Sequence, residues 1–380
     1  MANTTDPPTT DPPAIAIDVE PSSTMETKTS PLTANVARIL LLLRSLQRGR
    51  HNMDDPWIVL PLELHEFDDL FVRIGKNETL WGWVYDKLRF TYDSRTSTFV
   101  IRRPVRLHEA FQSQVDDWIQ DKLKAIADSN AQSKPFVQDI SCCRSATILI
   151  EPPGNERVVI SHSPDSQFIY LDTGWPSVVL EAARSLGPKS LSGLARDYIV
   201  QSGGNIRAVV GFELDTESKK VSLTVWRAHC FIHPENGPTV GMRSTTQVIR
   251  DEHGTTNPDE GSGLRLMLWD FAPDFVPDLR TTADPHPSLL IDSAALCKFI
   301  AIMEESERKR AAGELVTSSR YKDCVKKRSV WPEPEEVYEE DGFVFGEEEL
   351  SVHARFLGTP VDTRKVTEGD EKGDVGEVEK

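Results

Sequence analysis

Two short apolar segments near the middle of the chain have the pattern of paired strands. The first runs from Phe168 to Leu171 and the second from Val178 to Leu180. The tripeptide Asp172-Thr173-Gly174 between them is typical of a tight turn, so the pattern predicts a β-hairpin. If the hairpin is centred on this turn, Asp165 and Glu181 lie directly opposite each other, because both are equally far from it in the sequence.

The segments on either side of this hairpin predict further elements. An apolar stripe at helical spacing predicts a helix from Leu107 to Ala127, and a second helical pattern covers 186–201. Strands are predicted at 147–150 and 206–214, and alternation over 221–225 predicts one more. The order is therefore α-β-β-β-α-β followed by an additional strand, which predicts an α/β (α+β) fold with a mixed sheet.

Asp165 and Glu181 are the chemically informative pair in this arrangement. Directly opposed residues of an antiparallel pair have Cβ atoms about 5 Å apart. Two carboxylates at that distance repel each other unless a cation, a proton or water lies between them. The simplest interpretation of such a pair is a metal site.

Several short motifs occur in a fixed order around these carboxylates. They are Ser163-Pro164-Asp165-Ser166-Gln167-Phe168, Pro176-Ser177-Val178-Val179-Leu180-Glu181, Asp197-Tyr198, and the strand from Asn205 to Gly211. Together they resemble the PD-(D/E)XK restriction-endonuclease-like superfamily. Within it they are most similar to fungal proteins related to bacterial Uma-type restriction-endonuclease-like proteins. The resemblance extends from Trp57 to Phe271 and implies a restriction-endonuclease-like αβββαβ core.

The resemblance also implies a chemistry, namely metal-dependent hydrolysis of phosphodiester bonds in DNA or RNA. Asp165, Glu181 and the main-chain carbonyl of Ala182 would hold Mg²⁺ or Mn²⁺, which polarises the phosphate and activates water. The superfamily places a lysine two residues after the glutamate, and that position is Ala183 in this chain. An alanine cannot supply the charge of that lysine.

Other cations are candidates for this missing role. Lys189 is the preferred one, because it follows the strand on a loop that can reach back. Arg184 should point to the opposite face of the strand, and Arg196 lies further along the helix. The lysine that Uma-type proteins carry on this helix corresponds to Leu194. Glu109, at the start of the first helix, is the candidate for an additional acid at the metal site. Two interpretations stay open: an active nuclease, or a catalytically inactive nuclease fold kept for binding or as a scaffold.

Composition divides the chain into five regions. Residues 1–35 are rich in Thr, Pro, Ser and Asp and are expected to be disordered. Residues 36–106 are expected to form an N-terminal extension packed on the core, beginning with a short basic helix. Residues 107–230 would be the nuclease-like core, and 231–330 a C-terminal extension with a hairpin and a helix. Residues 331–380 carry 16 acidic and 5 basic residues and predict a mostly disordered acidic tail.

Charge and cysteine usage bear on partners and compartment. The net charge is −17, but residues 51–330 carry 33 basic and 39 acidic residues, so the predicted body is only weakly acidic and a nucleic-acid partner remains open. The arginines at 89, 102, 103 and 106 indicate either a solvated sheet face or a rim that contacts phosphates. No apolar run is long enough to span a membrane, and five cysteines without a framework predict an intracellular protein of the cytoplasm or nucleus.

Overall fold

The computed structural model describes residues 31–50, 57–102, 106–152, 154, 156–171, 173–183, 190–215, 218–235, 237–272 and 287–314. All the elements named below belong to the unit that begins at Thr33. The helical segments are α1 (Ala34–Gln47), α2 (Leu64–Gly75), α3 (Glu78–Lys87), α4 (Arg106–Ser129), α5 (Lys134–Gln138), α6 (Leu191–Arg196), the π-helical turn η1 (Asp197–Gln201), the 3₁₀ turn η2 (Leu268–Phe271) and α8 (Ser293–Ala311). The strands are β1 (Trp57–Pro61), β2 (Arg89–Asp93), β3 (Thr98–Arg102), β4 (Ile140–Cys142), β5 (Ile148–Ile150), β6 (Ile160–His162), β7 (Ser166–Tyr170), β8 (Pro176–Ala183), β9 (Ala208–Leu214), β10 (Val221–His233), β11 (Gly237–Arg250), β12 (Gly263–Met267) and β13 (Ser288–Asp292).

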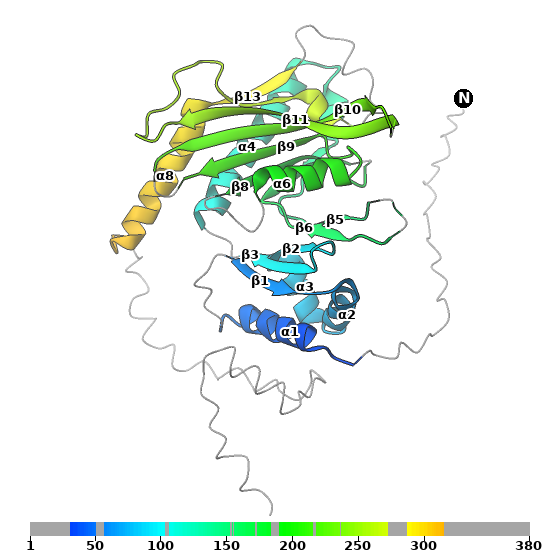
Figure 1. Cartoon of the computed structure of the whole chain (residues 1–380). Helices are drawn as coiled ribbons and strands as arrows, with labels where there is room; N and C mark the ends of the chain where they lie inside the picture. The colour runs from blue at the N-terminus through cyan, green and yellow to red at the C-terminus, as the bar shows by residue number, and fades with distance from the viewer. Residues whose placement is uncertain are drawn as a thin grey trace, which may run out of the picture. The chain divides into compact units, whose positions relative to one another are not determined.

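A five-stranded antiparallel sheet, in the order β1-β3-β2-β6-β5, carries three helices on one face. Its aromatic side chains point to these helices: Tyr92 stacks on Phe67 of α2 with ring centroids 4.0 Å apart, and Phe90 contacts Phe71 at 5.7 Å. Figure 1 shows α1, α2 and α3 beside β1–β3, on the side away from β8 and β9. The opposite face of this sheet is therefore turned toward β8 and α6.

The predicted basic helix at the start of this region is present as α1. The side chain of Thr33 caps it by accepting a hydrogen bond from the N–H of Val36 at 3.3 Å. The helix begins at residue 34, so the last residues of the segment expected to be disordered are helical. Residues 1–30 of that segment, and the predicted acidic tail at 331–380, lie outside the described residues.

The second sheet has six strands in the order β11-β10-β9-β8-β7-β4. β8 and β9 run parallel and the other neighbours run antiparallel, which confirms a mixed sheet in an α/β fold. The crossover between the parallel strands passes through α6 and η1. The elements α4, β4, β7, β8, α6 and β9 follow one another in the expected α-β-β-β-α-β order, with β5 and β6 inserted between β4 and β7.

One predicted strand belongs to a different sheet. The strand expected at 147–150 is β5, and it pairs with β6 of the five-stranded sheet instead of opening the six-stranded one. The first strand of the six-stranded sheet is β4, which is three residues long and only partly buried, so no apolar alternation marks it in the sequence. Because β6 also pairs with β2, the five-stranded sheet joins residues on both sides of the expected boundary at residue 107.

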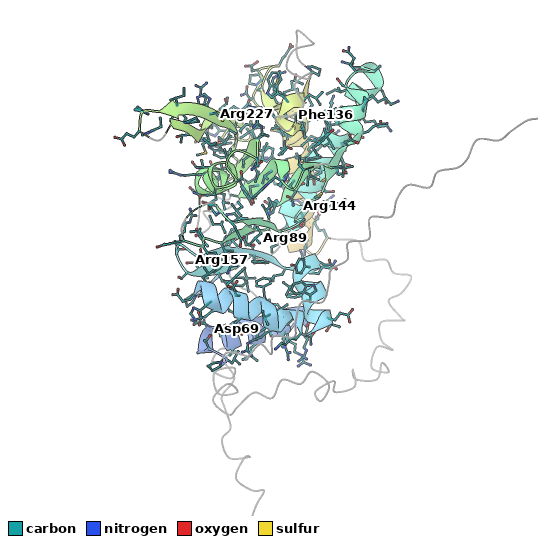
Figure 2. The ribbon with its side chains drawn as sticks, turned by 90° about the vertical axis from the view of Figure 1, so that its right-hand side faces the viewer. Asp69, Arg89, Phe136, Arg144, Arg157 and Arg227 are labelled. Atoms are coloured by element: carbon teal, nitrogen blue, oxygen red, sulfur yellow. The ribbon has the colours of Figure 1, made fainter. Side chains whose placement is uncertain are left out.

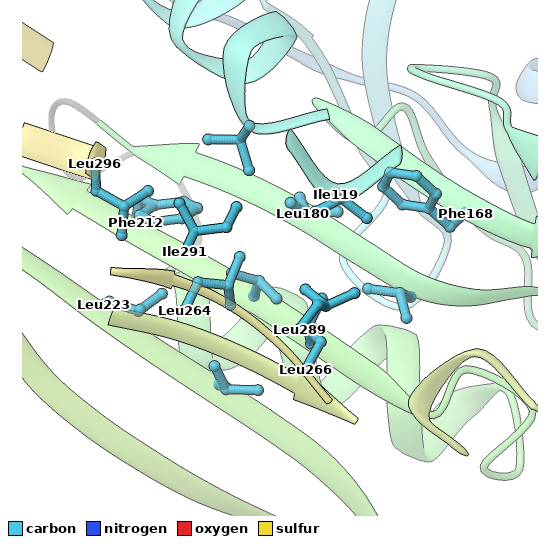
Figure 3. Packing of buried hydrophobic residues seen from close by; sticks show 14 of the residues in the cluster. Ile119, Phe168, Leu180, Phe212, Leu223, Leu264, Leu266, Leu289, Ile291 and Leu296 are labelled. Carbon is cyan, nitrogen blue, oxygen red and sulfur yellow. The ribbon is translucent and has the colours of Figure 1, made fainter. Parts of the chain in front are cut away.

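Apolar side chains fill both faces of the six-stranded sheet. On one face, residues of the sheet pack against α4, α8 and the β12–β13 pair (Figure 3). The labelled members of that cluster are Ile119, Phe168, Leu180, Phe212, Leu223, Leu264, Leu266, Leu289, Ile291 and Leu296. On the other face, Val179 and Val209 pack with α6, η1, β5 and β6. Glu181 shares this second face because side chains alternate along β8.

The helix expected in the C-terminal extension is present as α8, but the expected strand pair, 247–250 with 264–268, is wrong. Residues 247–250 belong to β11, which pairs with β10 at the edge of the six-stranded sheet, whereas β12 pairs with β13. Among the described helices, none is both long enough and apolar enough to cross a membrane.

Candidate functional site

The predicted hairpin forms with the predicted register. Ser166 pairs with Leu180, Gln167 with Val179 and Phe168 with Val178, before a bulge shifts the pairing by one residue. Continuing the same register by one residue brings Asp165 opposite Glu181. The two carboxylates are therefore on one face of the sheet, as predicted from the position of the turn.

A guanidinium lies between the two carboxylates. Nη1 of Arg102 is 3.5 Å from Oδ1 of Asp165 and 3.2 Å from Oε2 of Glu181. Nη2 of the same side chain donates to the main-chain carbonyl of Ser163. The guanidinium carbon also lies 5.7 Å from the centroid of the Trp57 ring. Arg102 comes from the last position of β3, so it reaches the site from the five-stranded sheet.

The remaining carboxylate oxygens are held by two further donors. The main-chain N–H of Ala182 donates to Oδ2 of Asp165 at 2.7 Å. The hydroxyl of Tyr198, which η1 positions over the sheet, donates to Oε1 of Glu181 at 2.7 Å. All four carboxylate oxygens therefore contact a donor supplied by the chain itself.

Burial dominates the electrostatics of this cluster. It raises the pKa of Glu181 to about 7, against the opposing effect of the Arg102 charge, and the nearby Asp165 adds to the rise. Burial alone would lower the pKa of Arg102, but the charges of Asp165 and Glu181 raise it above its usual value. Burial, and then Glu181, raise the pKa of Tyr198 well above its usual value. Arg102 and Tyr198 therefore stay protonated at neutral pH, while Glu181 titrates near it.

This arrangement does not fit a magnesium ion. Mg²⁺ requires an octahedron of oxygen ligands at about 2.1 Å, whereas a guanidinium nitrogen contacts both carboxylates here. Ala182, whose carbonyl the resemblance assigned to the metal, turns its N–H toward Asp165. Among the described residues, no three His, Cys, Asp or Glu side chains come together in a group that could bind a metal ion.

The other residues expected at the site lie elsewhere or outside the described residues. Lys189 and Arg184 fall in 184–189, which the structure does not describe. Arg196 is exposed on α6, and Ala183 packs against the apolar cluster of its face. Glu109 is 48% exposed, and its carboxylate lies 3.9 Å from Nη2 of Arg89, not against Asp165 or Glu181.

Neither a solvated sheet face nor a phosphate-contacting rim fits Arg89 and Arg102, the two members of the arginine group whose side chains the structure describes. The side chains of Arg89 and Arg102 are only 16% and 13% exposed. Figure 2 places Arg89 between the N-terminal helices and the six-stranded sheet. The alternation of side chains along β3 was sufficient to predict that Arg102 lies on the face away from the aromatic core. Its partners could not be predicted from the local sequence, because they lie 61 to 79 residues further along the chain.

A second polar cluster adjoins the first, and the sequence did not indicate it. Nε2 of His162 is 3.3 Å from Oδ2 of Asp197, and its Nδ1 is 3.4 Å from the hydroxyl of Thr91. Nη2 of Arg95 bridges Asp197 and Asp93, at 2.8 Å from each. The ring of His162 packs edge-on against Tyr198, which connects the two clusters.

A cavity of about 280 Å³ lies beside both clusters, between the five-stranded sheet and the segment formed by β8 and α6. Its lining residues are Trp57, Thr91, Asp93, Thr96, Thr98, Val100, Arg102, Glu181 and Leu194. Leu194, for which the resemblance implied a lysine, lines this cavity and gives it an apolar wall.

The comparisons with known proteins add no relative to this picture. No family model matches the chain, and a search of curated proteins finds no significant match.

Proposed function

We propose that this protein is a catalytically inactive, nuclease-like binding protein, in which the guanidinium of Arg102 takes the place of the divalent cation. The observation that carries the proposal is that a single nitrogen, Nη1 of Arg102, contacts both Asp165 and Glu181. A cation that bridges two carboxylates must lie at that point, so arginine and metal compete for the same position.

The chemistry of arginine favours a structural role for the pair. A guanidinium does not lose its proton at physiological pH and does not activate water as a metal ion does. It neutralises the repulsion between the two carboxylates and fixes β3 to the β7–β8 hairpin. The absence of a lysine at Ala183 agrees with a site that no longer needs to orient an attacking water.

Metal-dependent hydrolysis of DNA or RNA is the competing function. Mg²⁺ or Mn²⁺ would supply a polarised phosphate and an activated water, but only after Arg102 had left both carboxylates. Asp165 and Glu181 would then hold the ion, and Lys189 is the cation that the sequence offers beside it. Nucleic acid remains the partner class that the resemblance implies, and the cytoplasm or nucleus the expected compartment.

Cleavage and thermal unfolding in the presence of metal ions separate the two functions. We expect the full chain to leave single- and double-stranded DNA and RNA intact in millimolar Mg²⁺ or Mn²⁺. We also expect its midpoint of thermal unfolding to be the same with metal as with a chelator, because a ligand that does not bind the native state cannot stabilise it.

The matched variants are Asp165→Ala and Glu181→Ala. A metal-dependent cleavage that disappears in both variants would contradict the proposal and establish the nuclease. Weak cleavage that persists in both would indicate a contaminating enzyme and would leave the proposal standing.

A further inference from the structure

The outermost strand of the six-stranded sheet has one edge without a partner strand. β11 pairs with β10 from Gly237 to Arg250, and the register runs without a shift from Ser222 opposite Val248 to the turn. At the other side of the sheet the edge strand is β4, which has only three residues. A long edge exposes a row of N–H and C=O groups that can pair with another strand, whereas a short edge strand limits such pairing.

The loop that follows β11 covers only the end of this edge. The main-chain N–H of Asn257 donates to the carbonyl of Ile249 at 2.9 Å, and its side-chain amide donates to the carbonyl of Val248 at 2.8 Å. Within the described residues, only β10 forms backbone hydrogen bonds with residues 238–246. The free edge is therefore 238–246, and its central residue is Met242.

Residues 238–246 lack most of the features that usually protect an edge. They contain one charged residue, Arg243, and one proline, which is the first residue of the segment. No bulge interrupts their pairing with β10. Residues 243–246 are exposed, and 239–242 are half-buried. Natural sheets protect such edges with lysines, prolines or bulges, so an unprotected edge of this length indicates a partner strand.

A second copy of the chain offers an edge of the same length. We propose that residues 238–246 pair antiparallel with the same residues of a second copy, so that two six-stranded sheets join into one sheet across a two-fold axis. Pairing over the complete free edge places the axis at Met242, with Val240 opposite Ser244 of the second copy. Val240 and Met242 already pack against the apolar cluster beside α6 and η1. The second Met242 extends this cluster across the axis.

The other face of the paired strands joins an aromatic ring to a cation. Phe231 is 41% exposed, and its ring lies over Gly241, where an added Cβ would be 2.9 Å from Cε1. The two-fold pairing puts Arg243 of the second copy opposite Gly241, within reach of this ring for a cation–π contact. The two Arg243 side chains are not directly opposed, and turning toward the rings separates them further. Each copy supplies both halves of the contact, and this self-complementarity favours a second copy over an unrelated strand.

The inference goes beyond the proposed function, because the free edge contains neither Asp165 nor Glu181. Pairing over 238–246 makes a small interface, so we expect a dissociation constant of about 1 to 100 μM. Sedimentation equilibrium of the full chain over about 1 to 200 μM should therefore show a mass that rises from the monomer toward the dimer.

A charge-reversal pair tests the register. Thr239 lies opposite Thr245 of the second copy, on the face that carries Arg243. Thr239→Glu with Thr245→Glu places like charges opposite each other at two positions, whereas Thr239→Glu with Thr245→Lys places opposite charges there. We expect the first variant to raise the dissociation constant roughly two- to thirtyfold and the second to leave it equal or lower. Within one copy these positions do not face each other, so both variants should unfold at similar temperatures.

Cysteine cross-linking tests the position of the axis. The parent variant carries Cys143→Ser and Cys230→Ser, because both cysteines are exposed. Adding Met242→Cys should give a disulfide-linked dimer on mild oxidation, since directly opposed residues have Cα atoms about 4.5 to 5.5 Å apart, within the range of a disulfide. Ser244→Cys is the matched control, because its two copies lie about 13 Å apart along the strands. Ser244 is exposed and Met242 half-buried, so random collision would favour the control.

A chain that stays monomeric at about 200 μM would refute the inference and leave the edge to an extended segment of another protein. Equal dissociation constants in the two charge variants would refute it too, as would cross-linking of Ser244→Cys as complete as that of Met242→Cys. If a charge variant does not fold, the cysteine pair decides. None of these measurements involves metal ions or nucleic acid, so failure here leaves the proposed function intact, and metal-dependent cleavage would refute the proposed function without bearing on the dimer.

Discussion

Replacing Arg102 with methionine removes the guanidinium from between the two carboxylates while keeping a long side chain. In the native protein that guanidinium contacts Asp165 and Glu181 and donates to the carbonyl of Ser163. The variant would leave two acids facing each other with only the donors of Ala182 and Tyr198 to satisfy them. We expect Arg102→Met to fold but to be clearly less stable.

The size of the loss follows from the burial of the cluster. Removing one partner of a buried ion pair costs about 3 to 5 kcal/mol, because an uncompensated charge stays behind. The lower end applies here, since the pKa of Glu181 is already raised to about 7 and this acid can take up a proton when the guanidinium is gone. A loss of about 3 kcal/mol lowers the midpoint of thermal unfolding by about 6 to 12 °C in a domain of this size.

Urea unfolding of the wild type, Arg102→Met and Arg102→Lys measures this directly. Lysine keeps the charge but has one nitrogen, so we expect an intermediate loss of about 1 to 2 kcal/mol. Adding Asp165→Asn and Glu181→Gln to Arg102→Met should recover part of the lost stability, since neutral amides then replace both buried carboxylates.

Arg227→Met is the control for losing an ion pair elsewhere. Arg227 pairs with Asp270 at 2.9 Å, and Figure 2 shows it well away from Arg89. The stability lost in Arg227→Met should be the same whether or not Asp165→Asn and Glu181→Gln are added. A loss below about 1 kcal/mol in Arg102→Met, or no recovery on neutralising the acids, would refute the placement of the guanidinium between them.

Two further predictions concern stability. Burial raises the folded-state pKa of Glu181 from 4.5 to about 7, so the folded protein binds this proton more tightly than the unfolded chain does. The resulting contribution to the free energy of unfolding is complete below pH 4.5 and is lost as the pH rises through 7. The wild type should lose about 2 to 3 kcal/mol over this window, and urea unfolding of Glu181→Gln should show a flatter profile; an equal slope in both proteins would show that Glu181 does not titrate there. Gly211→Ala should cost about 1 to 3 kcal/mol in urea unfolding, because the new Cβ would lie 2.6 Å from the buried ring of Trp226. In Gly82→Ala, where nothing lies within 4 Å, helix propensity should leave stability equal or slightly higher, and equal effects at the two positions would contradict this packing.

The hairpin and its carboxylates could be predicted because local rules decide them. A turn centred on Thr173 fixes which residues face each other, and the observed register agrees from Ser166 to Phe168. The order of helices and strands followed from periodicity for the same reason. The short strand β4 was not predicted, because three partly buried residues are too few to show the alternation of apolar and polar positions that marks a strand.

The identity of the cation at the site could not be predicted from local pattern. The resemblance places a lysine where this chain has Ala183, and the candidate cations for its role, Arg184, Lys189 and Arg196, all follow Glu181 in the chain. Arg102 comes from another sheet, which joins the site only because β6 pairs with β2. Contacts of that kind depend on how two sheets pack, and no spacing along the chain encodes them.

A crystal structure of the full chain soaked in Mn²⁺, with anomalous scattering recorded at the manganese edge, would show directly which cation lies between Asp165 and Glu181. We expect density for the Arg102 guanidinium in contact with both carboxylates, and no anomalous peak between them. A manganese peak at that position, with Arg102 turned away from it, would refute the substitution of arginine for the metal and favour the metal-dependent nuclease.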